Sequence, residues 1–191
     1  MYVHKENIQP REETADEASM IRQAQANPEA FRPLYEKYFK KIFLFVLHRV
    51  GDKALTADIT SQVFLKALLH LDRYAFRGLP FSAWLFRIAL NECHDFFRKY
   101  KRHRVVSLDE HTIQNLHEEL TAAARQEDLE QQLPLILQQL SADDLQIIEL
   151  RYFDQRPFRE VADILGISET YAKVKVYRAL DRMKKLFLKT T

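Results

Sequence analysis

The residues most able to support covalent or metal chemistry in this sequence are one cysteine and seven histidines. The cysteine, Cys93, stands directly before His94 and Asp95, but adjacent residues on a helix point in different directions, which argues against a nucleophile and its base. The histidines show neither an HExxH motif nor zinc-type spacing with cysteine, and no glycine-rich phosphate loop is present. We therefore predict a protein that is not an enzyme, with no catalytic residue, metal, cofactor or small-molecule substrate.

Positive charge, by contrast, gathers in two zones. Five of the seven residues from 98 to 104 are Lys or Arg, and seven bases lie between 171 and 191 against Asp181 alone. Between these zones, from 107 to 130, seven acids accompany the single base Arg125. Separate basic zones suit the phosphate backbone of a nucleic acid, where each neutralised phosphate releases counterions. Taken alone, such charge runs are more typical of solvated helix faces.

The two basic zones lie among predicted helices. Hydrophobic residues make up 47% and aromatic residues 12% of the 191 residues, which is enough for packed cores. Asn27 and Pro28 form a cap and first turn that open a helix, while Pro33 either fits near that turn or kinks the helix. Segment 76–80 (FRGLP) is typical of a tight loop before a long helix. No stretch alternates polar and apolar residues as a strand would, so we predict an all-α protein.

The last third of the chain has the pattern of a helix-turn-helix from Phe158 to Met183. Gly166 falls where the turn between the two helices needs a positive φ, and Ser168 is placed to cap the second helix. One side of that helix is apolar and can pack inward, at Ala172, Val176, Leu180 and Met183. The opposite side is basic, which favours a helix in the major groove over a purely structural hairpin.

From about residue 27 to residue 186 the chain resembles the extracytoplasmic-function (ECF) group of bacterial sigma factors, the promoter-specificity subunits of RNA polymerase in the sigma-70 family. Segment 28–38 (PEAFRPLYEKY) resembles the group's opening helix, and segment 58–68 (DITSQVFLKAL) resembles the helix that docks on the polymerase clamp. Segment 76–99 resembles the loop and helix that capture the −10 element, and segment 140–185 resembles the domain that reads the −35 element. All four occur in the family's order.

The resemblance implies three sets of functional residues. Asp58, Gln62 and Phe64 would belong to the polymerase-binding surface, although Phe64 fits the core equally well. Aromatic faces beside cations can hold single-stranded bases out of the stack, and the residues implied for the −10 element are Phe76, Arg77, Trp84, Arg87, Asn91, Arg98, Lys99, Lys101 and Arg102. Core packing explains Trp84 equally well. The residues implied for the −35 element are Ser168, Glu169, Tyr171, Lys173, Val174, Lys175, Tyr177, Arg178 and Arg182.

The resemblance also implies an organisation and a set of partners. A polar segment (1–26) would precede a helical domain for polymerase and the −10 element (27–104), an acidic linker (105–132) and a helix-turn-helix domain for the −35 element (133–191). The partners would be promoter DNA, RNA polymerase core (the clamp of its largest subunit and its flap) and an anti-sigma factor, which could hold the protein at the inner face of the membrane. With no signal peptide and no apolar run of about 20 residues, we expect a cytoplasmic protein.

Two departures from the family's pattern affect these expectations. The clamp helix carries Ala57, Ser61 and Gln62 where the family usually has acid-rich polar residues, so the affinity for polymerase core could differ. The recognition helix carries Lys175 in place of an arginine that could form bidentate hydrogen bonds, and Val174 in place of a small hydroxyl residue. We hypothesise that Val174 contacts a thymine methyl group in the major groove.

Two other classes of function compete with a sigma factor. A one-component regulator would use the same helix-turn-helix to bind an operator without polymerase. A pure interaction protein would sequester a partner and contact no DNA, which would make both basic zones coincidental. The acidic linker also has two interpretations, because it could thread toward the polymerase active centre, as in the family, or serve as a solubilising tether that lets the two domains change their relative placement.

Overall fold

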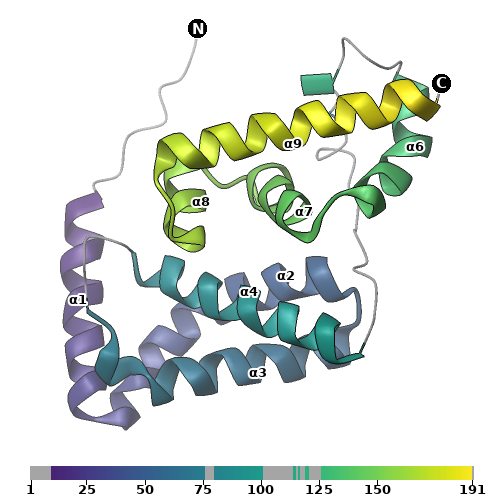
Figure 1. The fold of residues 1–191 in the computed structure, drawn as a ribbon. Helices are drawn as coiled ribbons and strands as arrows, with labels where there is room; N and C mark the ends of the chain where they lie inside the picture. The colour runs from purple at the N-terminus through teal and green to yellow at the C-terminus, as the bar shows by residue number, and fades with distance from the viewer. Residues whose placement is uncertain are drawn as a thin grey trace, which may run out of the picture.

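The protein folds into two groups of helices, one from each half of the chain (Figure 1). The computed structural model describes residues 10–75, 80–100, 114, 116, 119, 120 and 126–190, and every regular element there is helical. The first group consists of α1 (Pro10–Ala26), the 3-10 turn η1 (Pro28–Phe31), α2 (Arg32–Val50), α3 (Lys53–Leu69), the 3-10 turn η2 (Leu71–Arg73) and α4 (Phe81–Tyr100). The second group consists of α6 (Gln126–Gln139), α7 (Ala142–Ile148), the π-helical turn η3 (Glu149–Phe153), α8 (Phe158–Leu165) and α9 (Glu169–Thr190). The predicted all-α class with two small helical domains is confirmed.

The breaks between α1, α2 and α3 follow the local sequence signals. The Asn27 side chain accepts a hydrogen bond from the Glu29 N–H at 3.0 Å and so caps η1. Pro33 lies in the first turn of α2, where a backbone N–H would have no partner within the helix, so proline costs no hydrogen bond there. Of the two alternatives for Pro33, it therefore fits near the first turn. Gly51 ends α2 with φ 74°, and its N–H donates to the Leu47 carbonyl at 2.8 Å.

Helix α1 lies in the segment for which the sequence predicted only polarity. Its inward side is narrow, with Ile21 and Ala24 buried. Glu17 is buried as well, 6% exposed, and accepts hydrogen bonds from the Tyr38 hydroxyl and from Lys37, the latter at 3.0 Å. A carboxylate satisfied by two donors can be buried at moderate cost, so α1 is held by polar contacts as much as by apolar packing.

The helix-turn-helix is present as predicted. Helix α8 ends at Gly166 with φ 69°, a conformation that glycine adopts without strain. Ser168 caps α9 by accepting a hydrogen bond from the Tyr171 N–H at 3.2 Å. The residues predicted to pack inward from α9 are all buried, namely Ala172, Val176, Leu180 and Met183.

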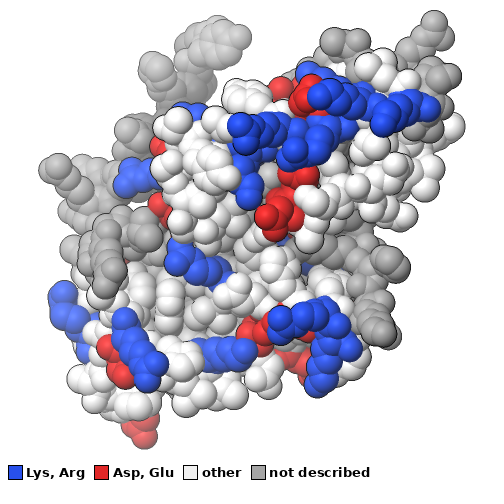
Figure 2. Space-filling view, in the orientation of Figure 1, with Lys and Arg blue, Asp and Glu red and all other residues white. Residues whose placement is uncertain are grey.

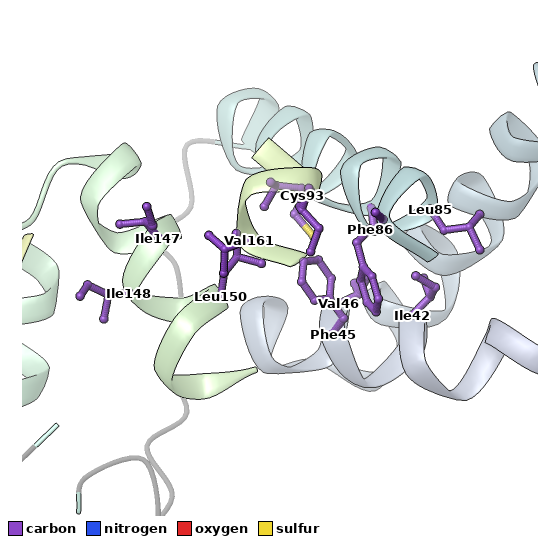
Figure 3. Packing of buried hydrophobic residues seen from close by; sticks show 14 of the residues in the cluster. Ile42, Phe45, Val46, Leu85, Phe86, Cys93, Ile147, Ile148, Leu150 and Val161 are labelled. Atoms are coloured by element: carbon purple, nitrogen blue, oxygen red, sulfur yellow. The ribbon is translucent and has the colours of Figure 1, made fainter. Parts of the chain in front are cut away.

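The two groups of helices pack directly against each other. Helix α4 lies against α8 (Figure 1), and the buried side chains of both groups belong to one apolar cluster. In Figure 3, Leu150 and Val161 from the second group face Phe45 and Cys93 from the first, and all four side chains are buried. The continuous core fixes how the two halves meet in this structure.

The predicted acidic linker (105–132) lies mostly outside the described residues. Its last residues are helical, because α6 begins at Gln126. Two isolated positions within the linker, Leu116 and Leu120, are buried. Of the helices in the described part of the chain, none combines the length and the apolar character that a membrane span requires.

Candidate nucleic-acid interface

The outer face of α9 carries an exposed cationic surface. Figure 2 shows Lys and Arg side chains gathered along α9, with acidic side chains directly beside them. Four predicted contact residues, Tyr171, Val174, Tyr177 and Arg178, point to solvent, with Tyr177 61% exposed and Val174 38% exposed. Exposed aromatic, aliphatic and cationic side chains along one helix can contact both base edges and phosphates.

Two of the predicted basic residues on α9 are held by acids at the start of α7. Asp144 is buried and accepts hydrogen bonds from the Ser141 hydroxyl, at 2.8 Å, and from Arg182. The Lys175 ammonium lies 3.7 Å from the Asp143 carboxylate. Together with Tyr171 and Arg178, these five side chains line an open hollow of about 430 Å³ between α7 and α9. The acids of α7 therefore restrict the directions in which two cations of α9 can point.

The remaining predicted residues of α9 lie at its first turns. Ser168 and Glu169 are exposed, and Ser168 is engaged as the cap. Lys173 forms an exposed ion pair with Glu169 at 2.8 Å, and its ammonium lies 5.7 Å from the centre of the Phe158 ring. Because both partners of this pair are about half exposed, the pair is weak and can open when a phosphate approaches.

An aromatic cluster lies at the N-terminal end of α4. Tyr74, Phe81 and Trp84 contact one another with ring centroids 5.0 to 5.4 Å apart. Burial and the nearby negative charge of Glu17 raise the pKa of Tyr74 to about 12. Gln25 of α1 donates to the carbonyl of Tyr74 at 2.9 Å, so α1 holds the backbone beside this cluster. Trp84 is partly buried and packs against the core, which is the alternative considered for it from the sequence.

The polar residues predicted along α4 divide into two kinds. Asn91, Arg98 and Lys99 are exposed, and Arg98 pairs with Asp95 at 2.8 Å on the surface. Arg87 instead donates hydrogen bonds to two carbonyls in the last turn of α8, those of Ile164 at 3.0 Å and Asp163 at 2.5 Å. Phe76, Arg77, Lys101 and Arg102, also predicted for this surface, lie outside the described residues.

A groove between α3 and α4 contains two of the three residues predicted to bind polymerase. Asp58 and Gln62 are exposed and line the groove, which has a volume of about 280 Å³, beside the apolar side chains of Leu55 and Ile59. Phe64 is only 4% exposed and packs against neighbouring aromatic rings, so it belongs to the core, which is the alternative considered for it above.

A buried charge cluster, absent from the sequence predictions, joins α2 to η3. Arg49 is 1% exposed, with Nη2 2.7 Å from Oδ2 of Asp154 and Nε 3.1 Å from Oε2 of Glu149. Burial acts to raise the pKa of Asp154, but the positive charge of Arg49 and hydrogen bonds from His48 and Arg49 outweigh it and lower that pKa. Likewise, burial acts to lower the pKa of Arg49, but the two carboxylates outweigh it and raise that pKa.

Comparison with known proteins connects both groups of helices to one family. Residues 34–103 match the model of sigma-70 region 2, and residues 130–183 match the model of sigma-70 region 4. The two matches together span well over half of the chain and occur in the family's order. The chain belongs to the sigma-70 family, in its ECF group. The first group of helices is therefore the region 2 half, and the second is the region 4 half.

Named relatives agree with this assignment. The ECF RNA polymerase sigma factor BldN of Streptomyces coelicolor is 29% identical over 169 residues, a match that covers 87% of this chain but only 64% of BldN. The ECF RNA polymerase sigma factor SigM of Bacillus subtilis is 27% identical over 155 residues, covering 81% of this chain and 93% of SigM. Among solved structures, the chain is similar to CnrH, solved in complex with the cytosolic domain of CnrY. That match covers 87% of this chain and 94% of CnrH, with 22% identity and a TM-score of 0.56, which shows a shared fold.

The structure brings the predicted residues of the region 4 half together along α9 and its cap, and it separates those of the region 2 half. Asp58 and Gln62 lie in the α3–α4 groove, Trp84 lies in the aromatic cluster, and Arg87 lies against α8. Sequence reasoning missed Arg49 and its acidic partners. The available signal was its register, because Arg49 falls on the apolar side of α2 with Ile42 and Phe45.

Proposed function

We propose that this ECF sigma factor directs RNA polymerase core to promoters, with its region 4 half reading the −35 element and its region 2 half holding the −10 element and the clamp. The observation that carries the proposal is the exposed face of α9, where aromatic, aliphatic and basic residues follow the turn of a helix-turn-helix. Such a face binds DNA without covalent chemistry, so we propose that the protein works by binding and not as an enzyme.

For the −35 element, we propose that Tyr171, Val174 and Arg178 face the major groove while Lys175 and Arg182 contact phosphates. The exposed Val174 side chain supports an apolar contact, because a thymine methyl group is the one apolar feature of the major groove. Val174→Ser should weaken binding to a thymine-bearing site and leave a site with cytosine at that position unaffected. Equal affinity of both proteins for the thymine site would refute this contact.

For the −10 element, we propose that the aromatic cluster at the start of α4 and the exposed cations at its end serve the opened strands and the upstream duplex. The half-buried rings of Tyr74 and Trp84 support this role, because aromatic faces stack on unpaired bases of any sequence, while the fully buried Phe81 packs against both rings. Asn91, Arg98 and Lys99 are exposed on the same helix and can reach DNA without rearrangement.

For the polymerase, we propose that the clamp of the largest subunit docks in the α3–α4 groove at Asp58 and Gln62, and that the flap receives the region 4 half. The apolar side chains of Leu55, Phe96 and Tyr100 in the same groove support this docking, because a partly apolar surface favours a protein partner. We propose the same division of the chain as the sequence suggested, with domains at 27–104 and 133–191 and an acidic linker at 105–132.

We also propose that an anti-sigma factor binds this protein in the cytoplasm and could hold it at the inner face of the membrane. The support is that CnrH, whose fold this chain shares, was solved with the cytosolic domain of another protein, CnrY. A cytoplasmic location agrees with a function that requires chromosomal DNA and polymerase.

Abortive transcription with purified core polymerase tests the proposal. Short RNAs from promoter fragments of the source genome should appear only when the protein is added. Arg178→Ala should reduce their yield, whereas Lys185→Ala, an equal change of charge near the far end of α9, should reduce it much less. If no RNA appears while the protein alone binds a specific duplex, the one-component regulator is the correct class. If the protein binds neither polymerase core nor DNA, the pure interaction protein is the correct class.

A further inference from the structure

Helix α1 stands at one end of the region 2 half, beside η2 and the start of α4 (Figure 1). Two of its polar side chains, Glu17 and Gln25, form hydrogen bonds to groups outside the helix, and neither is among the residues that the sequence predicts for function. They lie about 12 Å apart along the helix axis, at a rise of about 1.5 Å per residue. A rigid helix can therefore hold two separate points of the domain at a fixed distance.

Gln25 holds the chain where it leaves η2. Its side-chain amide donates to two carbonyls, those of Leu71 and Tyr74, each at 2.9 Å. Leu71 is buried, and its carbonyl also accepts the N–H of Tyr74 at 3.1 Å, so the amide bonds to both ends of this turn. The backbone at Tyr74 is therefore fixed to η2 and to α1 at the same time.

Glu17 holds the chain where α4 begins. Its Oε2 accepts the backbone N–H of Phe81 at 3.4 Å, and Phe81 is the first residue of α4, whose N–H no carbonyl of its own helix can reach. Its Oε1 accepts hydrogen bonds from the Tyr38 hydroxyl and from Lys37, the latter at 3.0 Å. The Tyr38 ring in turn lies 5.8 Å from the Phe81 ring, centre to centre. The buried Glu17 carboxylate thus connects α2 to the start of α4.

The two points held by α1 carry the aromatic rings assigned to the opened strands. The rings of Tyr74 and Trp84 lie 5.0 Å apart, centre to centre, and both are half-buried, so part of each faces solvent. The fully buried Phe81 contacts both rings. Tyr74 belongs to the backbone fixed by Gln25, whereas Trp84 belongs to the helix whose first residue is fixed by Glu17. The separation of the two half-buried rings therefore depends on both side chains of α1.

We propose that Glu17 and Gln25 are positioning residues for the −10 element, which hold the two half-buried rings in place before an unpaired base binds. The proposal rests on the proposed function, which assigns the rings of Tyr74 and Trp84 to the opened strands. A site that is already ordered loses less conformational entropy on binding and so binds more tightly. Removing either side chain leaves both rings present, but DNA must then order them as it binds, which lowers the affinity.

Trp84 is the only tryptophan of the chain, so its fluorescence reports on this cluster without a label. Gln25→Met keeps the length of the side chain and removes its donors, so it should raise the acrylamide quenching constant of the free protein. Gln25→Lys, which restores a donor, should return that constant to the wild-type value. Gln23→Met and Gln23→Lys are matched changes at an exposed position of α1 and should have no effect. Unchanged quenching in Gln25→Met, in a protein that keeps its helical circular dichroism, overturns the proposal.

Binding of the assembled holoenzyme to a preopened promoter tests the role in DNA binding. The probe is a promoter fragment found by abortive transcription, with its −10 segment unpaired by mismatches, so that melting is not part of the measurement. If the ordered arrangement falls to about a quarter of the free protein in Gln25→Met, the affinity should fall about fourfold. Glu17→Gln, which acts at the other point, should lower the affinity as well, while Glu36→Gln, an exposed change on α2, should not. Gln25→Lys should bind as tightly as Gln23→Lys, which adds the same charge.

The affinity for polymerase core alone separates positioning from folding. Gln25→Met should bind core as the wild type does, because the effect is confined to the two rings. A loss of core affinity equal to the loss of DNA affinity, or a loss that Gln25→Lys does not restore, overturns the positioning role. Equal affinity of wild type, Gln25→Met and Glu17→Gln for the preopened fragment overturns it too. If quenching changes as expected but wild-type protein with core starts no transcription, the proposed function fails and with it the DNA role, while the hold of α1 on the two rings stands.

Discussion

Helices α4 and α9 both carry cations predicted to meet DNA, yet they hold them in different surroundings. On α9, Arg178 is exposed, and the ion pairs along the helix, such as Lys185 with Asp181 at 2.7 Å, have both partners on the surface. On α4, Arg87 is half-buried and bound to the backbone of the opposite half. The Arg178 side chain thus faces solvent, whereas two donors of Arg87 are already occupied by carbonyls of α8.

The physical reason for this difference is solvent. An exposed ion pair is worth roughly 0.2–1 kcal/mol, because water solvates each partner almost as well as the other partner does. A buried pair resists the loss of one partner strongly, because the remaining charge has neither water nor a counter-ion. Substitutions in the exposed pairs of α9 should therefore change stability little, while substitutions in the buried pairs between the two halves should change it strongly.

The largest expected effect comes from removing the buried partner. Arg49→Met should lower the free energy of unfolding by about 3–5 kcal/mol, because Asp154 and Glu149 would remain buried without a counter-ion. Urea denaturation followed by circular dichroism measures the change. Arg32→Met is the matched control on the same helix, since its pair with Glu36 is exposed, and it should change stability by less than about 0.5 kcal/mol. Equal effects of the two changes would contradict the contrast between the surfaces.

A smaller effect should appear as a pH dependence. The pKa of Asp154 is lowered below its ordinary value of 3.8, so its ionised form is favoured in the folded protein. Its contribution is therefore complete above pH 3.8 and is lost as the pH falls through the lowered value. Asp154→Asn should cost less than Arg49→Met because Glu149 still pairs with Arg49. The stability difference between wild type and Asp154→Asn should be constant near neutral pH and shrink in acid. If the stability difference between the two proteins grew in acid instead, the pKa of Asp154 would be raised in the folded protein and not lowered.

Gly166→Ala should lower the free energy of unfolding by roughly 1–2 kcal/mol, because a Cβ atom disfavours φ 69°. The same atom would press on Arg87, so the change should also weaken the contact between the halves. Gly51→Ala, at φ 74°, carries the same backbone penalty at the end of α2. Thermal unfolding of both variants gives the comparison. A larger loss of stability for Gly166→Ala than for Gly51→Ala would measure the steric clash with Arg87. Equal losses would show that the Arg87 guanidinium moves aside without a measurable change in stability.

The exposed helix should respond in binding and not in folding. Arg178→Ala should leave stability nearly unchanged, because the side chain is exposed. It should weaken duplex binding several-fold and reduce the slope of log affinity against log salt by about 0.9 if it neutralises one phosphate. Fluorescence anisotropy across a salt series measures both. An unchanged slope with relaxed sequence preference would place Arg178 on a base edge instead.

The sequence was sufficient for features set by neighbouring residues. The turn at Gly166, the cap at Ser168 and the inward side of α9 all follow from local preferences, and the structure shows each of them. The exposure of Asp58 and Gln62 on α3 follows in the same way, from the period of the apolar residues between them.

Features that depend on partners far along the chain could not be predicted from the sequence. Arg49 and Asp154 are 105 residues apart, and periodicity carries no information about which distant acid a buried arginine meets. The same limit explains Arg87, which the pattern marked as a polar residue for contact without revealing that α8 is its contact here. Helix α1 escaped prediction because hydrogen bonds donated to Glu17 by Lys37 and Tyr38 replace much of an apolar face.

The smallest expected effect is on the surface of α9, at the pair of Lys185 with Asp181. Both side chains are more than half exposed, so Lys185→Ala should change the free energy of unfolding by only about 0.3–0.5 kcal/mol. That small loss should vanish in 1 M salt, where the screening length falls to about 3 Å. The loss caused by Arg49→Met should persist in the same salt, because ions do not enter a buried contact. Urea denaturation of both variants at low and high salt checks this, and a salt-sensitive Arg49 effect would mean that solvent reaches the contact between the two halves.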